Sequence, residues 1–190
     1  MPPKAKFTKE EVIQTALSLV RQNGIDGLTA RSLGAALKTS SRPIFTAFHN
    51  MEDVIQAVLS AAKALYAQYI EEGLRETIAF KGVGAAYIRF AMEEPKLFQL
   101  LFMAEQATLP SITGVLPLID DNYEKILQSI VDGYSIDETK AKDLYQHLWV
   151  YSHGIASLCA TKMCRFTPKQ IGDMMTEVFS SLYLKSIGKG

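Results

Sequence analysis

The stretch KTSSRPIFTAFHN, residues 38–50, predicts a very short helix with two different sides. Ile44 and Phe48 are four residues apart and share one face, which predicts an apolar anchor. Arg42, Thr46 and His49 fall on the other face when about 100° is allowed per residue. A helix this short is not stable alone. An anchored back with a small, polar, cationic front therefore indicates a segment held in place to present that front.

The segments around this stretch predict two more helices with clear boundaries. Thr8 and Glu11 form a capping box that opens the first helix, and Gly24 ends it. Thr29 caps a second, short helix, and we expect Ser40 to cap the third after a break. Two short helices joined by a tight turn, the second polar in front, are typical of a helix-turn-helix that presents side chains to the major groove of DNA.

The rest of the chain also follows the helical period, and no strand alternation persists. Asn50 caps a fourth helix that we expect to reach about Glu72. Residues 104–115 predict an irregular connection, residues 117–132 predict one helix that ends at Gly133, and Thr167 with Gln170 opens the last helix. The sequence predicts an all-α chain of about nine helices. We expect residues 1–50 to form a three-helix helix-turn-helix domain and residues 51–190 to form a larger helical bundle.

The charge distribution favours a nucleic-acid partner, although the whole chain has a net charge of zero. Residues 1–50 contain seven lysines and arginines against three acids, a balance of +4. The remaining residues contain thirteen basic and seventeen acidic side chains, a balance of −4. The positive charge is concentrated in the first quarter of the chain, beside the predicted helix-turn-helix.

Residues 7–60 resemble the tetracycline-repressor (TetR) family of bacterial regulators. The capped first helix, the "G-x-x-x-L-T" lead into the second, the "I-F-x-x-F" of the short helix and the "N-x-E-D" that follows occur in the family's order. The resemblance implies a homodimer that binds a palindromic operator on double-stranded DNA and a small-molecule effector. We expect DNA contacts from Lys4, Lys6, Thr29, Arg31, Lys38, Ser40, Ser41, Arg42, Pro43, Phe45, Thr46 and His49.

Three positions depart from the family pattern. Phe45 replaces the usual tyrosine and lacks its hydroxyl, Met51 replaces the usual lysine, and Lys38 replaces the usual glycine of the turn. We therefore expect fewer phosphate contacts, or contacts partly supplied by Lys38.

The C-terminal half resembles the regulatory domain named for a Trp-His-Gly motif, here Trp149, His153 and Gly154. An aromatic cluster at helical spacing predicts either solid core or a cavity for a mostly apolar effector. We favour the cavity. Its expected lining residues are Tyr66, Tyr69, Tyr87, Arg89, Phe90, Phe98, Phe102, Trp149 and His153.

The final helix is apolar over a wider arc than docking on one neighbour requires. The excess predicts a contact between two copies of the chain, formed by the last two helices of each. The expected interface residues are Leu148, Ile155, Cys159, Met175, Val178 and Leu182.

The sequence argues against an enzyme, because it contains no metal-binding spacing of histidines, no nucleophile motif and no phosphate loop. We expect no metal and no cofactor. Free cysteines and the lack of a long apolar segment predict a cytoplasmic protein. A helical scaffold that binds another protein through its last helices is the alternative, and the basic N-terminal segment disfavours it.

Overall fold

The computed structural model describes residues 7–105 and 109–188, and every regular element in these ranges is helical. The prediction of an all-α chain is confirmed, with ten α-helices in the described residues. They are α1 Lys9–Asn23, α2 Ala30–Ala36, α3 Ile44–Ala47, α4 Met51–Leu74, α5 Ala79–Glu93, α6 Pro95–Phe102, α7 Ile112–Ile119, α8 Tyr123–Tyr134, α9 Glu138–Ala160 and α10 Pro168–Ser186, with a short 3-10 helix at Ile25–Gly27. None of the described helices is long and apolar enough to cross a lipid bilayer.

The chain divides into two compact units, and helix α4 contributes to both. The first unit comprises the described residues up to Leu65 together with Lys96–Ala104. The second comprises Tyr66–Pro95 and the described residues from Glu105 onward. The division therefore falls inside α4, and most of α6 belongs to the first unit.

Helix α1 begins and ends where the sequence predicts. The Thr8 hydroxyl accepts a hydrogen bond from the Glu11 N–H at 3.1 Å, and the Glu11 carboxylate accepts one from the Thr8 N–H at 2.7 Å. This reciprocal pair satisfies N–H groups that the first turn leaves without partners. The helix ends at Asn23, where Gly24 adopts a φ of +78°. Glycine reaches this region without a steric penalty.

The prediction that Ser40 caps the third helix is wrong. Helix α3 begins at Ile44, Pro43 holds the N-cap position, and no side chain caps the helix. Proline disfavours the helical conformation of the residue before it, here Arg42, so the helix cannot start further upstream. The assignment of residues to two helical faces therefore holds only for Ile44–Ala47, and Arg42 lies in the turn before the helix.

The end of α3 is set by the start of the next helix. Phe48 is extended, with φ −134° and ψ 145°. The Asn50 side chain accepts a hydrogen bond from the Asp53 N–H at 2.8 Å, and the Asp53 carboxylate accepts one from the His49 N–H at 3.1 Å. These two bonds cap α4 as the sequence predicts, and they hold Phe48 and His49 outside α3.

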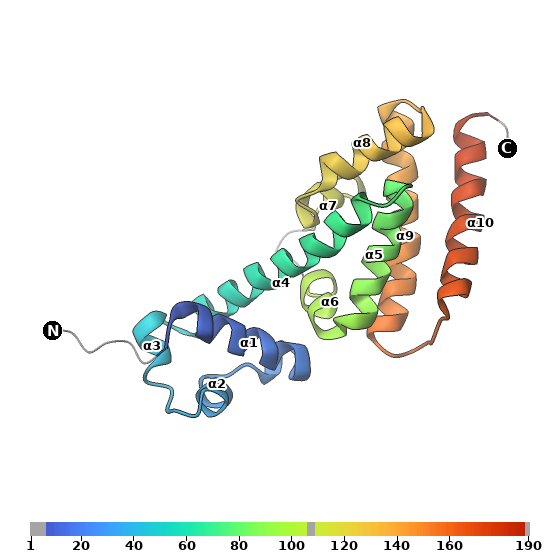
Figure 1. Cartoon of the computed structure of the whole chain (residues 1–190). Helices are drawn as coiled ribbons and strands as arrows, with labels where there is room; N and C mark the ends of the chain where they lie inside the picture. The colour runs from blue at the N-terminus through green and yellow to red at the C-terminus, as the bar shows by residue number, and fades with distance from the viewer. Residues whose placement is uncertain (1–6, 106–108, 189–190) are drawn as a thin grey trace. The chain divides into compact units, whose positions relative to one another are not determined.

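The second unit is built around α5 and α9, which run side by side (Figure 1). Helix α8 packs on both of them, and α10 lies along α9. Helix α4 approaches α5 at two glycines, since a Cβ added to Gly73 would lie 2.6 Å from the carbonyl oxygen of Gly82. The two backbones are therefore closer than side chains would allow.

Residues 104–120 contain more helix than the sequence predicts. Ser111 caps α7 by accepting a hydrogen bond from the Gly114 N–H at 3.2 Å. The chain then leaves the helix at Asp120, which has an extended backbone, and α8 begins at Tyr123. The single helix expected over residues 117–132 is thus two helices, because Asp120 accepts a hydrogen bond from the Asn122 N–H at 2.9 Å and closes a turn between them.

Candidate functional site

The first unit presents a polar surface over a buried anchor. The Ile44 side chain is fully buried and Phe48 is 5% exposed, as their spacing predicts. Arg42, Thr46 and His49 are exposed beside them. The remaining predicted DNA contacts of the described residues are exposed at Thr29, Arg31, Lys38, Ser40 and Phe45 and half-buried at Ser41 and Pro43. Lys4 and Lys6 lie outside the described residues.

The hydroxyl of Thr29 is already engaged within the chain. It accepts a hydrogen bond from the Ser32 N–H at 3.1 Å, and the Ser32 hydroxyl accepts one from the Thr29 N–H at 2.9 Å. This capping box starts α2 and fixes the direction in which Arg31 leaves the first turn. Thr29 thus serves to start α2, the helix that carries Arg31.

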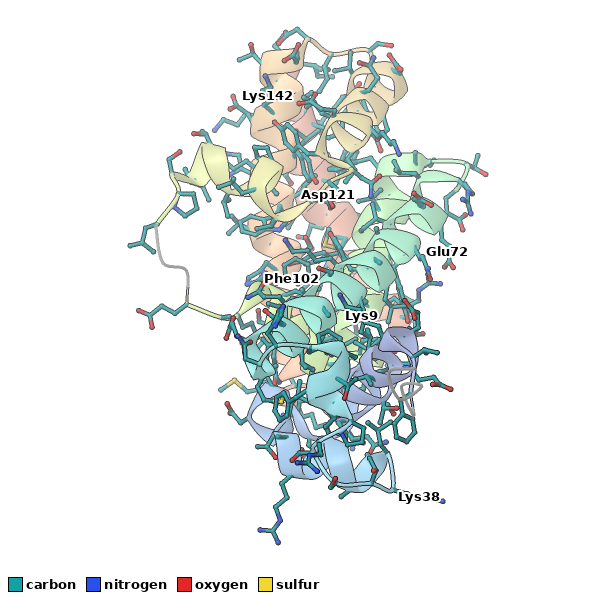
Figure 2. The ribbon with its side chains drawn as sticks, turned by 90° about the vertical axis from the view of Figure 1, so that its left-hand side faces the viewer. Lys9, Lys38, Glu72, Phe102, Asp121 and Lys142 are labelled. Carbon is teal, nitrogen blue, oxygen red and sulfur yellow. The ribbon has the colours of Figure 1, made fainter. Side chains whose placement is uncertain are left out.

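Lys38 occupies an unusual backbone position in the turn between α2 and α3. Its φ is +53°, in the left-handed region that favours glycine. Figure 2 shows its side chain pointing away from the ribbon at the end of the first unit. A strained residue with an exposed ammonium group places a positive charge where the family pattern has none.

Close packing holds the turn in shape. A Cβ added to Gly34 of α2 would lie 3.1–3.2 Å from backbone atoms of Thr39, Ser40 and Ser41. On the other side of the anchor, the Lys9 ammonium lies 5.1 Å from the centre of the Phe48 ring. Both contacts fix the segment that carries Arg42.

The second unit contains a cavity of about 360 Å³. Residues from α4, α5, α7, α8, α9 and α10 line it, and most of them are apolar or aromatic. Its aromatic lining consists of Tyr66, Phe80, Tyr87, Tyr134, Tyr145, Trp149 and Phe179. A largely apolar cavity with a few polar groups is the common form of a small-molecule site.

Asp120 is the acidic group of this lining, and it is only 5% exposed. It lies at the end of α7, where its Oδ2 accepts a hydrogen bond from the Tyr66 hydroxyl at 2.7 Å and its Oδ1 accepts one from the Asn122 N–H at 2.9 Å. Burial raises the pKa of the Asp120 carboxyl, while these two hydrogen bonds oppose the shift. Burial and the nearby Asp120 charge also raise the pKa of Tyr66 and of Tyr145.

The second polar feature is a chain of side chains from α5 to α9. The Tyr87 hydroxyl lies 2.8 Å from Nδ1 of His153, whose ring centre is 5.3 Å from that of Trp149. Burial raises the pKa of Tyr87 and lowers that of His153. The indole nitrogen of Trp149 is buried and makes no hydrogen bond, although it lies near enough to Tyr87 to oppose the shift in the Tyr87 pKa.

The structure brings only some of the predicted pocket residues to the cavity. Tyr66, Tyr87 and Trp149 line it. His153 reaches it only through its contacts with Tyr87 and Trp149. Phe98 and Phe102 belong to the first unit, where their rings pack 5.2 Å apart.

The other predicted pocket residues form a separate group. Phe90 is fully buried, with its ring 5.4 Å from Tyr66 and 5.2 Å from Tyr69. Arg89 is exposed and pairs with Glu72, and its guanidinium lies 4.9 Å from the Tyr69 ring. Burial and a hydrogen bond to Glu93 raise the pKa of Tyr69 to about 12.

Sequence reasoning missed Asp120, Tyr145 and the contribution of α10 to the cavity. The polar run Asp120–Asn122 lies inside the single helix expected over residues 117–132, and no pattern in it marks one acid as buried. Tyr145 lies in the helix that we expected to contribute to a contact between two copies of the chain, and helical periodicity does not mark a residue that lines a cavity.

The predicted dimer residues fall into two groups. Leu148 and Ile155 are buried within the single chain. Cys159, Met175, Val178 and Leu182 are half-buried. No residue of α10 is fully buried. Met175 lines the cavity, whereas Val178 and Leu182 do not.

These features define a class of protein: an all-α chain with two short helices joined by a turn in one unit and a largely apolar cavity in the other. Residues 80–182 match the family described as "Tetracyclin repressor-like, C-terminal domain". The match covers more than half of the chain, so this chain belongs to the TetR family of transcriptional regulators. The predicted family is confirmed, and the Trp-His-Gly subtype stays a prediction.

A solved structure of similar fold aligns with nearly all of the chain. It is the crystal structure of a protein assigned to the TetR family of transcriptional regulators from Mesorhizobium loti MAFF303099, with a TM-score of 0.50 and 16% sequence identity. The alignment covers 93% of this chain and 94% of that one. No curated protein matches the chain.

Proposed function

We propose that this chain is a DNA-binding transcriptional repressor that binds a palindromic operator as a homodimer and is controlled by a small apolar ligand. The observation that carries the proposal is the segment from Ser41 to His49, in which Arg42 and Thr46 are exposed over the buried Ile44 and Phe48. The side chains at the front can meet base edges, and the anchor keeps them in register. The exposed Arg31 and Lys38 supply positive charge for phosphates.

Ligand control rests on the cavity of the second unit. A ligand shifts a protein between two states only if it binds one of them better. Tyr66 lines the cavity from α4, and α4 begins directly after the segment that carries Arg42. A ligand that displaces Tyr66 therefore acts on a helix that continues into the DNA-binding unit.

The test begins with DNA fragments selected from the organism's genome by the purified full chain. A shared palindrome is the expected result, and binding should weaken by ~10³ or more between 50 and 200 mM salt if the dimer covers six or more phosphates. The absence of any DNA binding at low salt would contradict the proposal and favour the protein-scaffold alternative.

Arg42→Ala then separates base reading from phosphate binding. We expect a loss of about 1–3 kcal/mol on the selected operator and relaxed preference at one position of each half-site, because arginine reads guanine through two hydrogen bonds. Arg31→Ala is the matched control, and it should weaken all sequences alike. If Arg42→Ala also weakens all sequences equally, Arg42 is only a phosphate contact.

A further inference from the structure

The apolar character of the cavity does not account for Asp120. A carboxylate in such surroundings loses its hydration, and an isolated buried charge is costly unless it is paired. Within the described part of the chain, no lysine or arginine forms an ion pair with Asp120. Lys81 also lines the cavity, but its side chain is exposed.

We infer that the cavity takes an apolar ligand that carries a protonated amine, and that the amine is placed against the carboxylate of Asp120. The inference rests on the proposed function, because it names the chemical class of the ligand for the same cavity. The cation comes from the ligand, and it supplies the charge partner that the described chain does not.

The geometry of Asp120 leaves room for this partner. A carboxylate has about four acceptor positions. The Tyr66 hydroxyl occupies one on Oδ2 and the Asn122 N–H occupies one on Oδ1. The same two bonds fix the carboxylate in place, so it does not have to be ordered when a ligand binds. An ammonium group, with three donors, can use the remaining positions.

The rings around Asp120 favour the same ligand charge. Tyr66 and Tyr145 line the cavity and are both close enough to Asp120 for its charge to raise their pKa. Aromatic faces attract cations and offer nothing comparable to an anion. A ligand carboxylate would instead be repelled by Asp120 and would have to reach the exposed Lys81.

The experiment compares three probes of one size: 4-phenylbutylamine, 4-phenylbutan-1-ol and 4-phenylbutyrate. The readout is the fluorescence of Trp149, which lines the cavity and is the single tryptophan of the chain. Titrations use the full-length protein at pH 7.5. We expect the amine to bind about 10-fold or more tightly than the alcohol, as a charged hydrogen bond allows, and the carboxylate to bind most weakly.

Two variants assign the preference to one residue. Asp120→Asn should bring the amine to the affinity of the alcohol and leave the alcohol within about 2-fold of its wild-type value, since only the charge pair is lost. Asp121→Asn is the matched control, because Asp121 is the exposed neighbour of Asp120 in the connection between α7 and α8 (Figure 2). It removes the same charge and should leave the amine preference unchanged.

The outcomes distinguish the inference from the proposed function. If the alcohol or the carboxylate binds wild type as tightly as the amine, the amine class is wrong, while control through the cavity stands. If the preference persists in Asp120→Asn, Asp120 is not its source. If no probe changes Trp149 fluorescence, the cavity is not a ligand site and the ligand control proposed above fails with the inference. The wild-type ranking decides the ligand class even if Asp120→Asn does not fold.

Discussion

At the scale of single residues, the Asp120 carboxyl should contribute less to the free energy of unfolding at neutral pH than it does in acid. Its pKa is raised above the ordinary value of 3.8, chiefly by burial. The folded chain therefore holds this proton more tightly than the unfolded chain. The contribution of Asp120 to the free energy of unfolding is complete below about pH 3.8 and is lost as the pH rises through the raised pKa.

Asp120→Asn should therefore be more stable than wild type at pH 7, and the difference should narrow toward pH 4. The tyrosine hydroxyls that face Asp120 do not titrate in this range, because Tyr66, Tyr87 and Tyr145 all have a raised pKa. Urea denaturation of both proteins from pH 4 to pH 8 gives the difference curve. A wild type that is more stable than Asp120→Asn at pH 7 would show that the carboxylate stabilises the fold.

Lys38 and Ser135 have the same backbone strain in different places. Both have a positive φ, +53° and +52°. Glycine adopts this region freely, so Lys38→Gly and Ser135→Gly should each raise the free energy of unfolding by about 1 kcal/mol. Urea denaturation is the measurement.

The two variants should differ in DNA binding. Ser135 caps the end of α8 in the second unit, and Ser135→Gly should leave operator affinity unchanged. Lys38→Gly removes an exposed charge and should weaken operator binding and reduce its dependence on salt by about one phosphate. Equal operator affinity in both variants would show that Lys38 does not touch DNA.

At the scale of helices, the contact between α4 and α5 depends on the absence of side chains at Gly73 and Gly82. A Cβ on Gly82 would collide with the Gly73 carbonyl oxygen and would also lie 2.8 Å from the Glu76 side chain. Backbone atoms of a helix cannot move aside as the end of a side chain can. Gly82→Ala should therefore lower the free energy of unfolding by about 1–3 kcal/mol or more, despite the better helix propensity of alanine.

Gly133→Ala is the matched control for this contact. Gly133 lies in α8, and a Cβ there would meet nothing within 4 Å. Its substitution should raise the free energy of unfolding by up to about 1 kcal/mol, because only helix propensity changes. The comparison is made by thermal and urea denaturation. A Gly82→Ala protein as stable as wild type would mean that α4 and α5 can separate at no cost.

The helices also show how far sequence reasoning reaches. The starts of α1, α2, α4 and α10 were predictable because each depends on a hydrogen bond between residues three apart. The burial of Ile44 and Phe48 followed from their spacing. The short extent of α3 was not predictable from helical periodicity, because Pro43 limits where the helix starts and the cap of α4 limits where it ends.

The cavity was less predictable than the helices. Inward-facing aromatics were visible in the sequence, but whether they fill space or surround it depends on how several helices pack. Phe90 and Tyr66 are in ring contact, yet only Tyr66 lines the cavity. The buried Asp120 carboxylate accepts a hydrogen bond from Tyr66, 54 residues away in the chain. No local pattern encodes such a contact.

At the scale of the whole molecule, α10 is a helix whose apolar side chains are only partly covered by the rest of the chain. Its apolar side chains do not reach full burial, although α9 packs on it. One side of α10 serves the cavity through Met175 and Phe179. Val178 and Leu182 do not line the cavity, and both are half-buried. Apolar groups left at a surface favour association with a partner, and a second copy of the chain would cover both.

Leu182→Glu should therefore convert the proposed dimer to a monomer, because a charge cannot be buried unpaired in an apolar interface. Leu184→Glu is the matched control, since residues two apart point ~200° apart on a helix, and it should leave the dimer intact. Sedimentation velocity at micromolar concentration measures both.

The Leu182→Glu monomer should keep its affinity for the phenylbutylamine probe, because Leu182 does not line the cavity. It should lose most of its affinity for a palindromic operator, because two half-sites need two linked recognition segments. A wild type that sediments as a monomer, or a Leu182→Glu protein that remains a dimer, would place the dimer contact elsewhere or remove it.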